Sequence, residues 1–181
     1  MTVPAHPSPV PAWMALPAAG VLVTADQLLK GWALTHLSSG QVVTPFIPGW
    51  IEWTLTFNTG AAWSLFSDLA LPLALGRLLF GVGTLAFLFI RPQPPVPLTA
   101  ITLLAAGALG NAIDGLRTGR VTDMITSPAL DTLSRLAGSD RFPVFNLADV
   151  FVVMGVILLL GMAVVNERNE KRAQLRPEVR Q

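Results

Sequence analysis

The sequence predicts an all-α membrane protein in which four transmembrane helices carry a small extramembrane β-sheet and a short interfacial helix. Of its 181 residues 52% are hydrophobic and only 13% are charged, whereas about 25% are charged in an ordinary soluble domain. The apolar residues also gather in long blocks. A run of about 20 apolar residues spans a bilayer as a helix, so we expect one polytopic domain over residues 1–181. The blocks are residues 14–25, 69–90, 98–113 and 150–165.

The two ends of the chain fall outside the predicted spans. Residues 1–12 are rich in proline and contain no Lys or Arg, so they lack the basic region of a cleavable signal peptide and are expected to form a flexible lead. Residues 166–181 form a charged, basic tail. By the positive-inside rule this tail and Arg91 are cytoplasmic, and an even number of spans puts both termini on that side. Arginines between residues 117 and 141 weaken this assignment.

Composition excludes several classes of function. The net charge of +1 and the absence of a massed basic face argue against nucleic-acid binding. With no cysteine, the chain has no disulfide, thiolate nucleophile or thiolate metal site. His6 and His36 are too far apart for a metal-ligand spacing, and we expect no metal and no cofactor. Any chemistry must come from carboxylates and amides.

The first half of the chain combines two spans with a strand pattern. The first span, residues 13–37, contains Asp26 and Lys30 at i and i+4 and therefore on one helix face. Residues 51–58 alternate apolar and polar side chains, which is typical of a half-buried strand. Tryptophans in residues 50–63 favour a sheet at the headgroup level. The second span is expected over residues 69–90, followed by a stiff turn over residues 91–97.

The second half contains two more spans and a long loop. We expect the third span over residues 98–115, an extramembrane loop over residues 118–145 and the fourth span over residues 146–165. Within the loop, residues 128–138 begin with Pro and end with Gly, which are helix start and stop signals. This segment places Leu130, Leu133, Leu136 and Ala137 on one face and is predicted to be an interfacial helix.

Polar side chains stand where these apolar blocks begin and end. Asn111 and Asp114 are i and i+3 at the end of the third span, and Asn146 and Asp149 are i and i+3 at the start of the fourth. Each pair shares a helix face. If the two spans are antiparallel neighbours, the pairs meet at one membrane level, with Asp123 just beyond. Two close carboxylates share one proton, which supplies an acid and a base for activating water; either aspartate can hold that proton.

Four ordered segments resemble the motif blocks of lipoprotein signal peptidase, also called signal peptidase II. They are DQLLK at 26–30, FNTGAAWS at 57–64, GALGNAID at 107–114 with GRVTD at 119–123, and FNLAD at 145–149. The resemblance implies a membrane aspartic endopeptidase with a surface β-cradle, active as a monomer in the bacterial inner membrane near its outer face. Its substrate would be a diacylglyceryl-modified prolipoprotein, cut just before the lipidated cysteine.

Site residues follow from the same resemblance. Asp123 and Asp149 would form the catalytic dyad. The residues that would position the site and the substrate are Asp26, Lys30, Asn58, Gly60, Asn111, Asp114, Asn146 and Ala148. Two departures from the family pattern stand out: Gly115 follows Asp114 where the family has Arg, and Ala106-Gly107 replaces two glycines. Arg117, three residues after Asp114, is therefore expected to be the cation that partners this carboxylate.

Other interpretations of these residues remain open at this stage. Asp26 and Lys30 can be a purely structural ion pair, Asn58 can form an Asx turn before Gly60, and Arg117 can be an interfacial anchor. Gly107 and Gly110 are expected to let two spans approach closely. A small transporter or proton-relay protein is the alternative of another class, but the two halves of the chain lack the symmetry and broken helices such proteins show. A structural scaffold leaves the polar residues unexplained.

Overall fold

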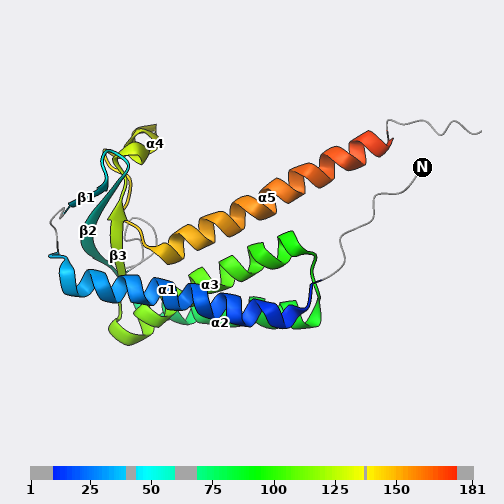
Figure 1. The fold of residues 1–181 in the computed structure, drawn as a ribbon, viewed down its shortest axis with the longest axis horizontal. Coiled ribbons are helices and arrows are strands. Elements are labelled where there is room, and N and C mark those ends of the chain that lie inside the picture. Colours follow the sequence, from blue (N-terminus) through cyan, green and yellow to red (C-terminus); the bar gives the residue numbers. More distant parts are fainter. Residues whose placement is uncertain (1–9, 40–43, 60–68, 137, 175–181) are drawn as a thin grey trace, which may run out of the picture.

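The computed structural model describes residues 10–39, 44–59, 69–136 and 138–174 (Figure 1). Four helical segments are long and apolar enough to cross a membrane, as predicted. Gly60, Trp63, Ala137 and the outermost residues of both termini lie outside the described residues. In chain order the elements are η1 (Ala12–Met14), α1 (Ala15–His36), β1 (Thr44–Ile47), β2 (Ile51–Asn58), α2 (Ala70–Ile90), α3 (Pro95–Thr118), β3 (Val121–Thr126), η4 (Pro128–Leu130), α4 (Asp131–Leu136) and α5 (Leu147–Gln174).

Helix α3 is the centre of the bundle. Its apolar window is 56% buried, compared with 17% for each of the other three spans, and it packs against α1, α2 and α5. The helix begins at Pro95, earlier than the expected start at residue 98. Proline is well suited to the first turn of a helix, where its missing N–H has no intrahelical partner to lose. The stiff turn before α3 is correspondingly shorter than predicted.

Small residues allow α3 to approach its neighbours closely. A Cβ atom on Gly107 would meet the Ala148 carbonyl oxygen and would lie 2.6 Å from Val152 Cγ2 on α5. A Cβ atom on Gly110 would lie 2.7 Å from Asp26 Oδ2. Both glycines therefore have the packing role that the sequence predicts, and the polar ends of α1, α3 and α5 come together as a result.

The sheet is three-stranded and antiparallel, in the order β1-β2-β3. Strand β2 matches the predicted strand at both ends. Strand β3 was not predicted: the sequence assigns residues 121–126 to a loop, but they pair with β2, with Thr56 opposite Asp123 and Asn58 opposite Val121. The structural reason is the end of α3, where Gly119 takes a φ of 70° and turns the chain back toward β2.

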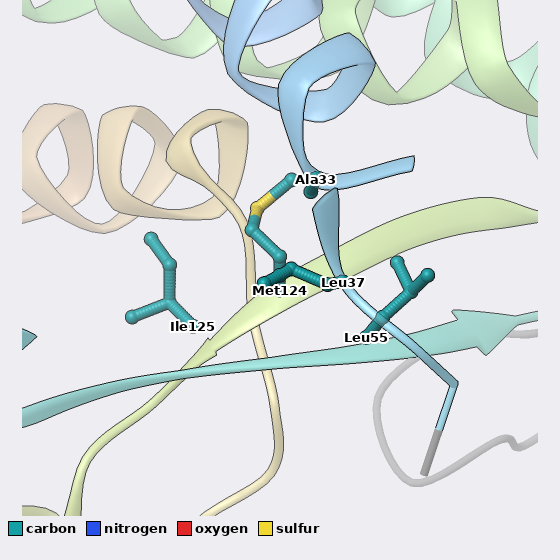
Figure 2. Packing of buried hydrophobic residues seen from close by; sticks show 5 residues of the cluster. All are labelled: Ala33, Leu37, Leu55, Met124 and Ile125. Carbon is teal, nitrogen blue, oxygen red and sulfur yellow. The ribbon is translucent and has the colours of Figure 1, made fainter. Parts of the chain in front are cut away.

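A hydrophobic cluster joins the sheet to the end of α1. Figure 2 shows its buried members: Ala33 from the last turn of α1, Leu37 directly after that helix, Leu55 from β2, and Met124 and Ile125 from β3. Ala33 and Met124 are fully buried. Burial of this apolar surface fixes β3, and therefore Asp123, relative to the membrane helices.

The remaining elements lie at the two ends of the bundle. The sheet and α4 lie at one end of the helices, whereas the start of α1 and the end of α5 lie at the other (Figure 1). The predicted interfacial helix is present as η4 and α4. Helix α5 continues to Gln174, past the predicted end of the fourth span near residue 165, so the first part of the predicted basic tail is helical. Polar helix-forming residues extend it, and Glu167 and Lys171 form an i, i+4 ion pair at 2.5 Å.

Candidate active site

A short β-bridge brings the two predicted catalytic aspartates together. The Phe145 N–H donates to the Ile125 carbonyl at 2.9 Å, and the Ile125 N–H donates to the Phe145 carbonyl at 2.9 Å. Asp123 precedes Ile125 by two residues on β3, and Asn146 directly follows Phe145. The segment before α5 is thereby held against β3, so that the first turn of α5 faces Asp123.

Asn146 and Asp149 cap the start of α5 reciprocally. The Asp149 N–H donates to Asn146 Oδ1 at 3.0 Å, and the Asn146 N–H donates to Asp149 Oδ2 at 3.1 Å. This is the geometry of a capping box, in which side chains three residues apart satisfy each other's backbone N–H groups. The side-chain amide of Asn146 is therefore fixed in rotation, with its NH2 group directed away from α5.

Two asparagine amides link the aspartates into one network. Asn146 Nδ2 donates to Asp123 Oδ1 at 2.6 Å and to Asn111 Oδ1 at 3.0 Å. Asn111 Nδ2 in turn donates to Asp149 Oδ1 at 2.8 Å. Each aspartate thus accepts a hydrogen bond from the side-chain amide of one asparagine, and the two side-chain amides bond to each other. The i, i+3 pairs predicted from the sequence do meet at one level.

Asp123 lies in an environment that favours its neutral form. Its relative exposure is 3%. Burial and, to a lesser degree, the negative charge of nearby Asp149 raise the pKa of the Asp123 carboxyl to about 7, against the lowering effects of the hydrogen bond from Asn146 and the positive charge of Lys30. An acid with this pKa can hold its proton at neutral pH and release it during a reaction.

Lys30 is the cation of this cluster. Its ammonium group contacts Asp26 Oδ2 at 2.9 Å, Asp114 Oδ2 at 3.1 Å and Asn111 Oδ1 at 3.0 Å. The residue is only 2% exposed. A buried ion pair of this kind is maintained only when both charges have good partners, and the geometry here meets that condition.

Asp114 is bound from three directions. Besides Lys30, Gln27 Nε2 donates to its Oδ1 at 2.9 Å and the Thr122 N–H donates to its Oδ2 at 3.0 Å. The expectation that Arg117 partners this carboxylate was wrong. Arg117 is exposed and forms no ion pair with the described residues, because the last turn of α3 presents it to solvent while α1 supplies the cation. A role for Arg117 toward substrate stays a prediction.

Asp26 and Ala148 also form a pair. The Ala148 N–H, in the first turn of α5, donates to Asp26 Oδ1 at 2.9 Å. Both residues are fully buried. An anion at a helix N-terminus is stabilised by the unpaired N–H groups and the helix dipole. Asp26 therefore anchors α5 to α1. The small side chain of Ala148 also allows α5 to pack closely against α3 at Gly110.

Two predicted residues lie at the edge of this network. Asn58 ends β2, half-buried and opposite Val121, on the same pair of strands as Asp123. Gly60 lies outside the described residues. Their proposed contacts with substrate stay predictions.

Two residues with structural roles at the site, Gln27 and Gly119, were not predicted from the sequence. Gln27 links α1 to α3 through Asp114 and the Gly110 carbonyl, the latter at 3.2 Å. Its position next to Asp26 and three residues before Lys30 could have indicated this role. Gly119 ends α3 in the left-handed conformation and directs the chain into β3. A glycine just after an apolar helix is a known termination signal.

An apolar cavity of about 750 Å³ lies away from these polar residues, between the first halves of α1 and α3. Trp13, Pro17 and Val21 line one side, and Leu98 and Thr102 line the other. The Thr102 hydroxyl donates to the Leu98 carbonyl at 2.7 Å, which leaves an apolar lining. This cavity holds no group that could perform acid or base chemistry, so the amide-linked aspartates are the candidate active site.

Comparisons with known proteins identify the family of this chain. The sequence profile of the family described as Signal peptidase (SPase) II matches residues 18–165. The lipoprotein signal peptidase of Deinococcus radiodurans is 48% identical over 171 residues, which is 94% of this chain and 90% of the relative. The lipoprotein signal peptidase of Streptococcus pyogenes serotype M1 is 36% identical over 146 residues, covering 77% of this chain and 86% of the relative.

Solved structures give the same result at the level of the fold. A bacterial membrane enzyme determined by the in meso method at 2.3 Å resolution superposes with a TM-score of 0.74 and 26% identity, over 98% of this chain and 100% of that one. A second, at 1.9 Å resolution, gives a TM-score of 0.70 and 28% identity, over 88% and 97%. The profile covers most of the chain, including the whole of α2 and α3 and most of α1 and α5. The chain therefore belongs to the signal peptidase II family and is a bacterial membrane protease.

Proposed function

We propose that this chain is an aspartic endopeptidase that removes the signal peptide from diacylglyceryl-modified prolipoproteins, just before the lipidated cysteine, with Asp123 and Asp149 as its catalytic dyad. The observation that carries the proposal is the amide network: Asn146 bonds to both aspartates, so two carboxyl groups are held in one partly dry site. Two carboxyl groups in such a site share a proton and act as an acid and a base.

In each of the two steps of the reaction, one aspartate accepts a proton and the other donates one. The ionised aspartate takes a proton from water as the water oxygen attacks the scissile carbonyl carbon, and the neutral aspartate gives its proton to the carbonyl oxygen. The roles then reverse: the tetrahedral intermediate collapses, the peptide nitrogen leaves with a proton, and a new carboxyl end forms on the signal peptide. The network of Asn111 and Asn146 keeps both carboxyl groups in place through these steps.

Substrate and topology follow from the family and from the arrangement of the helices. The relatives are named for lipoprotein signal peptides, and a lipidated precursor would reach the polar cluster from the surrounding bilayer. With the basic end of α5 in the cytoplasm, the opposite end of the bundle, which carries the sheet and the dyad, lies at the outer face. We expect the enzyme to act as a monomer.

The test is a pair of isosteric substitutions. Asp123→Asn and Asp149→Asn preserve the shape of the carboxyl group and can still accept the hydrogen bonds of the asparagines, but neither can transfer the proton. Each variant should lose at least about 1,000-fold in turnover of a lipidated precursor while keeping the thermal unfolding temperature and substrate binding of the parent protein. Substantial turnover by either variant would remove that residue from the dyad.

A further inference from the structure

The ammonium group of Lys30 has no hydrogen-bond donor left for a substrate. An ammonium group carries three N–H donors, and Lys30 has three acceptors within 3.1 Å: one oxygen each of Asp26, Asp114 and Asn111. With 2% exposure it also has no open path to a ligand. Its charge acts on Asp123 directly and lowers the pKa of that carboxyl. A contribution through hydrogen bonds must pass through one of these three neighbours, and only Asn111 bonds to a catalytic aspartate.

The ammonium group determines which way the Asn111 amide points. An ammonium cannot accept a hydrogen bond, so the Asn111 atom that faces Lys30 must be the carbonyl oxygen. Asn146 also donates to this oxygen, at 3.0 Å, because its own amide is fixed by the Asp149 N–H. The Asn111 NH2 group is then left to donate to Asp149 at 2.8 Å. Lys30 thus ensures that Asp149 faces a donor.

The hydrogen bonds of the two aspartates are unequal. Asp149 accepts an N–H on each oxygen, from Asn111 on Oδ1 and from the Asn146 backbone on Oδ2, and it lies in the first turn of α5. Asp123 accepts one hydrogen bond from the described residues, from Asn146, and is almost fully buried. Donated hydrogen bonds and a helix N-terminus favour an ionised carboxylate, whereas burial favours a neutral one. The pKa of Asp123, raised to about 7, agrees with this difference.

We propose that Lys30 is a positioning residue that acts through Asn111 to make Asp149 the ionised member of the dyad and Asp123 the protonated one. The inference rests on the proposed function. In the first step Asp149 takes the proton from water as its oxygen attacks, and the Asp123 hydroxyl gives its proton to the carbonyl oxygen. The charged groups around the pair are Lys30 and Asp26 from α1 and Asp114 from α3.

The test measures the pH dependence of kcat/KM for the full-length enzyme on a diacylglyceryl-modified precursor peptide in detergent. The acidic limb of this profile reports protonation of the ionised aspartate. Lys30→Met removes the positive charge and should move the acidic limb to higher pH by about one pH unit. Asn111→Leu leaves both ion pairs of Lys30 in place and should move the limb in the same direction, which keeps the test valid if Lys30→Met fails to fold.

The matched control is Asp114→Asn, which removes another contact of Lys30 without breaking the link through Asn111. It takes away a negative charge, so the acidic limb should stay in place or move to lower pH. An unchanged limb in folded Asn111→Leu, or a shift to higher pH in Asp114→Asn, would overturn the inference and leave Lys30 with a structural role alone. The proposed function fails separately, if Asp123→Asn or Asp149→Asn retains turnover.

Discussion

The buried charged residues Lys30 and Asp114 have their partners within the bundle, whereas exposed Arg117 forms no ion pair with the described residues. Lys30 has three oxygen partners and Asp114 accepts from Lys30, Gln27 and the Thr122 N–H. Removal of one partner from a buried pair costs several kcal/mol because the other charge is left uncompensated. Arg117, on the exposed side of the same helix end, has no comparable environment.

This difference predicts the effect of two arginine substitutions. Arg117→Ala should change the free energy of unfolding by less than about 0.5 kcal/mol, as expected for a surface change. Arg120→Ala should cost about 0.5–1 kcal/mol, because the Arg120 guanidinium lies 3.8 Å from the centroid of the Phe57 ring. Thermal unfolding of both variants in detergent measures the difference. A larger loss of unfolding free energy for Arg117→Ala than for Arg120→Ala would show that Arg117 takes part in the ion-pair network.

For individual residues, the sequence predicted which polar side chains form the site but not all of their hydrogen-bond and ion-pair partners. The i, i+3 spacing of Asn111 with Asp114, and of Asn146 with Asp149, correctly indicated that the polar faces meet. The partner of Asp114 could not be found in this way, because local spacing favours Arg117 while the actual cation, Lys30, comes from a helix more than 80 residues earlier in the chain. The correct rotation of α1 against α3 depends on packing, at Gly110 above all.

Helix packing against α3 leads to a prediction about its glycines. Gly107→Ala should destabilise the protein by about 1–3 kcal/mol, because the added Cβ would meet the Ala148 carbonyl and Val152. Gly161→Ala is the matched control: this glycine also lies in a spanning helix, but nothing lies within 4 Å of the added Cβ. The control should be neutral or slightly stabilising, since alanine favours a helix. Equal unfolding temperatures for the two variants would contradict this packing.

The exposed face of α4 leads to a prediction about substrate binding. Leu133 and Leu136 are 58% and 83% exposed, so they do not hold the bundle together and are available to the bilayer or a bound lipid. Changing both to Asp should raise KM for a lipidated precursor several-fold with the unfolding temperature unchanged. Thr132→Asp adds a charge to the same helix without removing apolar surface, and should leave KM near the parent value. Unchanged KM in the double variant would show that α4 does not contact substrate.

The sequence predicted elements well where hydropathy or alternation was strong. All four spans and β2 followed from these patterns. Strand β3 did not, because its six residues are too few for a clear period and its partner β2 lies more than 60 residues away. The continuation of α5 past Val165 was missed because hydropathy marks only the part of a helix that lies in lipid. The helix past Val165 is favoured by the helix propensity of its polar residues and by the ion pair between Glu167 and Lys171.

The whole molecule brings the proposed catalytic groups together by joining a helix, a strand and the start of a second helix at one level. Helix α3 supplies Asn111, β3 supplies Asp123 and the start of α5 supplies Asp149. The buried cluster around Met124 fixes the sheet on α1, and the bridge between Ile125 and Phe145 fixes α5 on the sheet. The position of the proposed dyad therefore depends on tertiary contacts across the fold. These contacts hold the carboxyl groups of Asp123 and Asp149 close together in a partly dry site.

The central claim, that Asp123 and Asp149 share one proton at neutral pH, is tested most directly by the pH dependence of kcat/KM. The measurement uses the full-length enzyme in detergent on a lipidated precursor, from about pH 4 to about pH 9. Because the pKa of Asp123 is raised to about 7 and this residue must be protonated to act as the acid, activity should fall as the pH rises through that value. At the acidic end activity should fall again once both carboxyl groups are protonated and no base is left, giving a bell-shaped profile. A rate that stays constant or increases up to about pH 9 would contradict the shared proton.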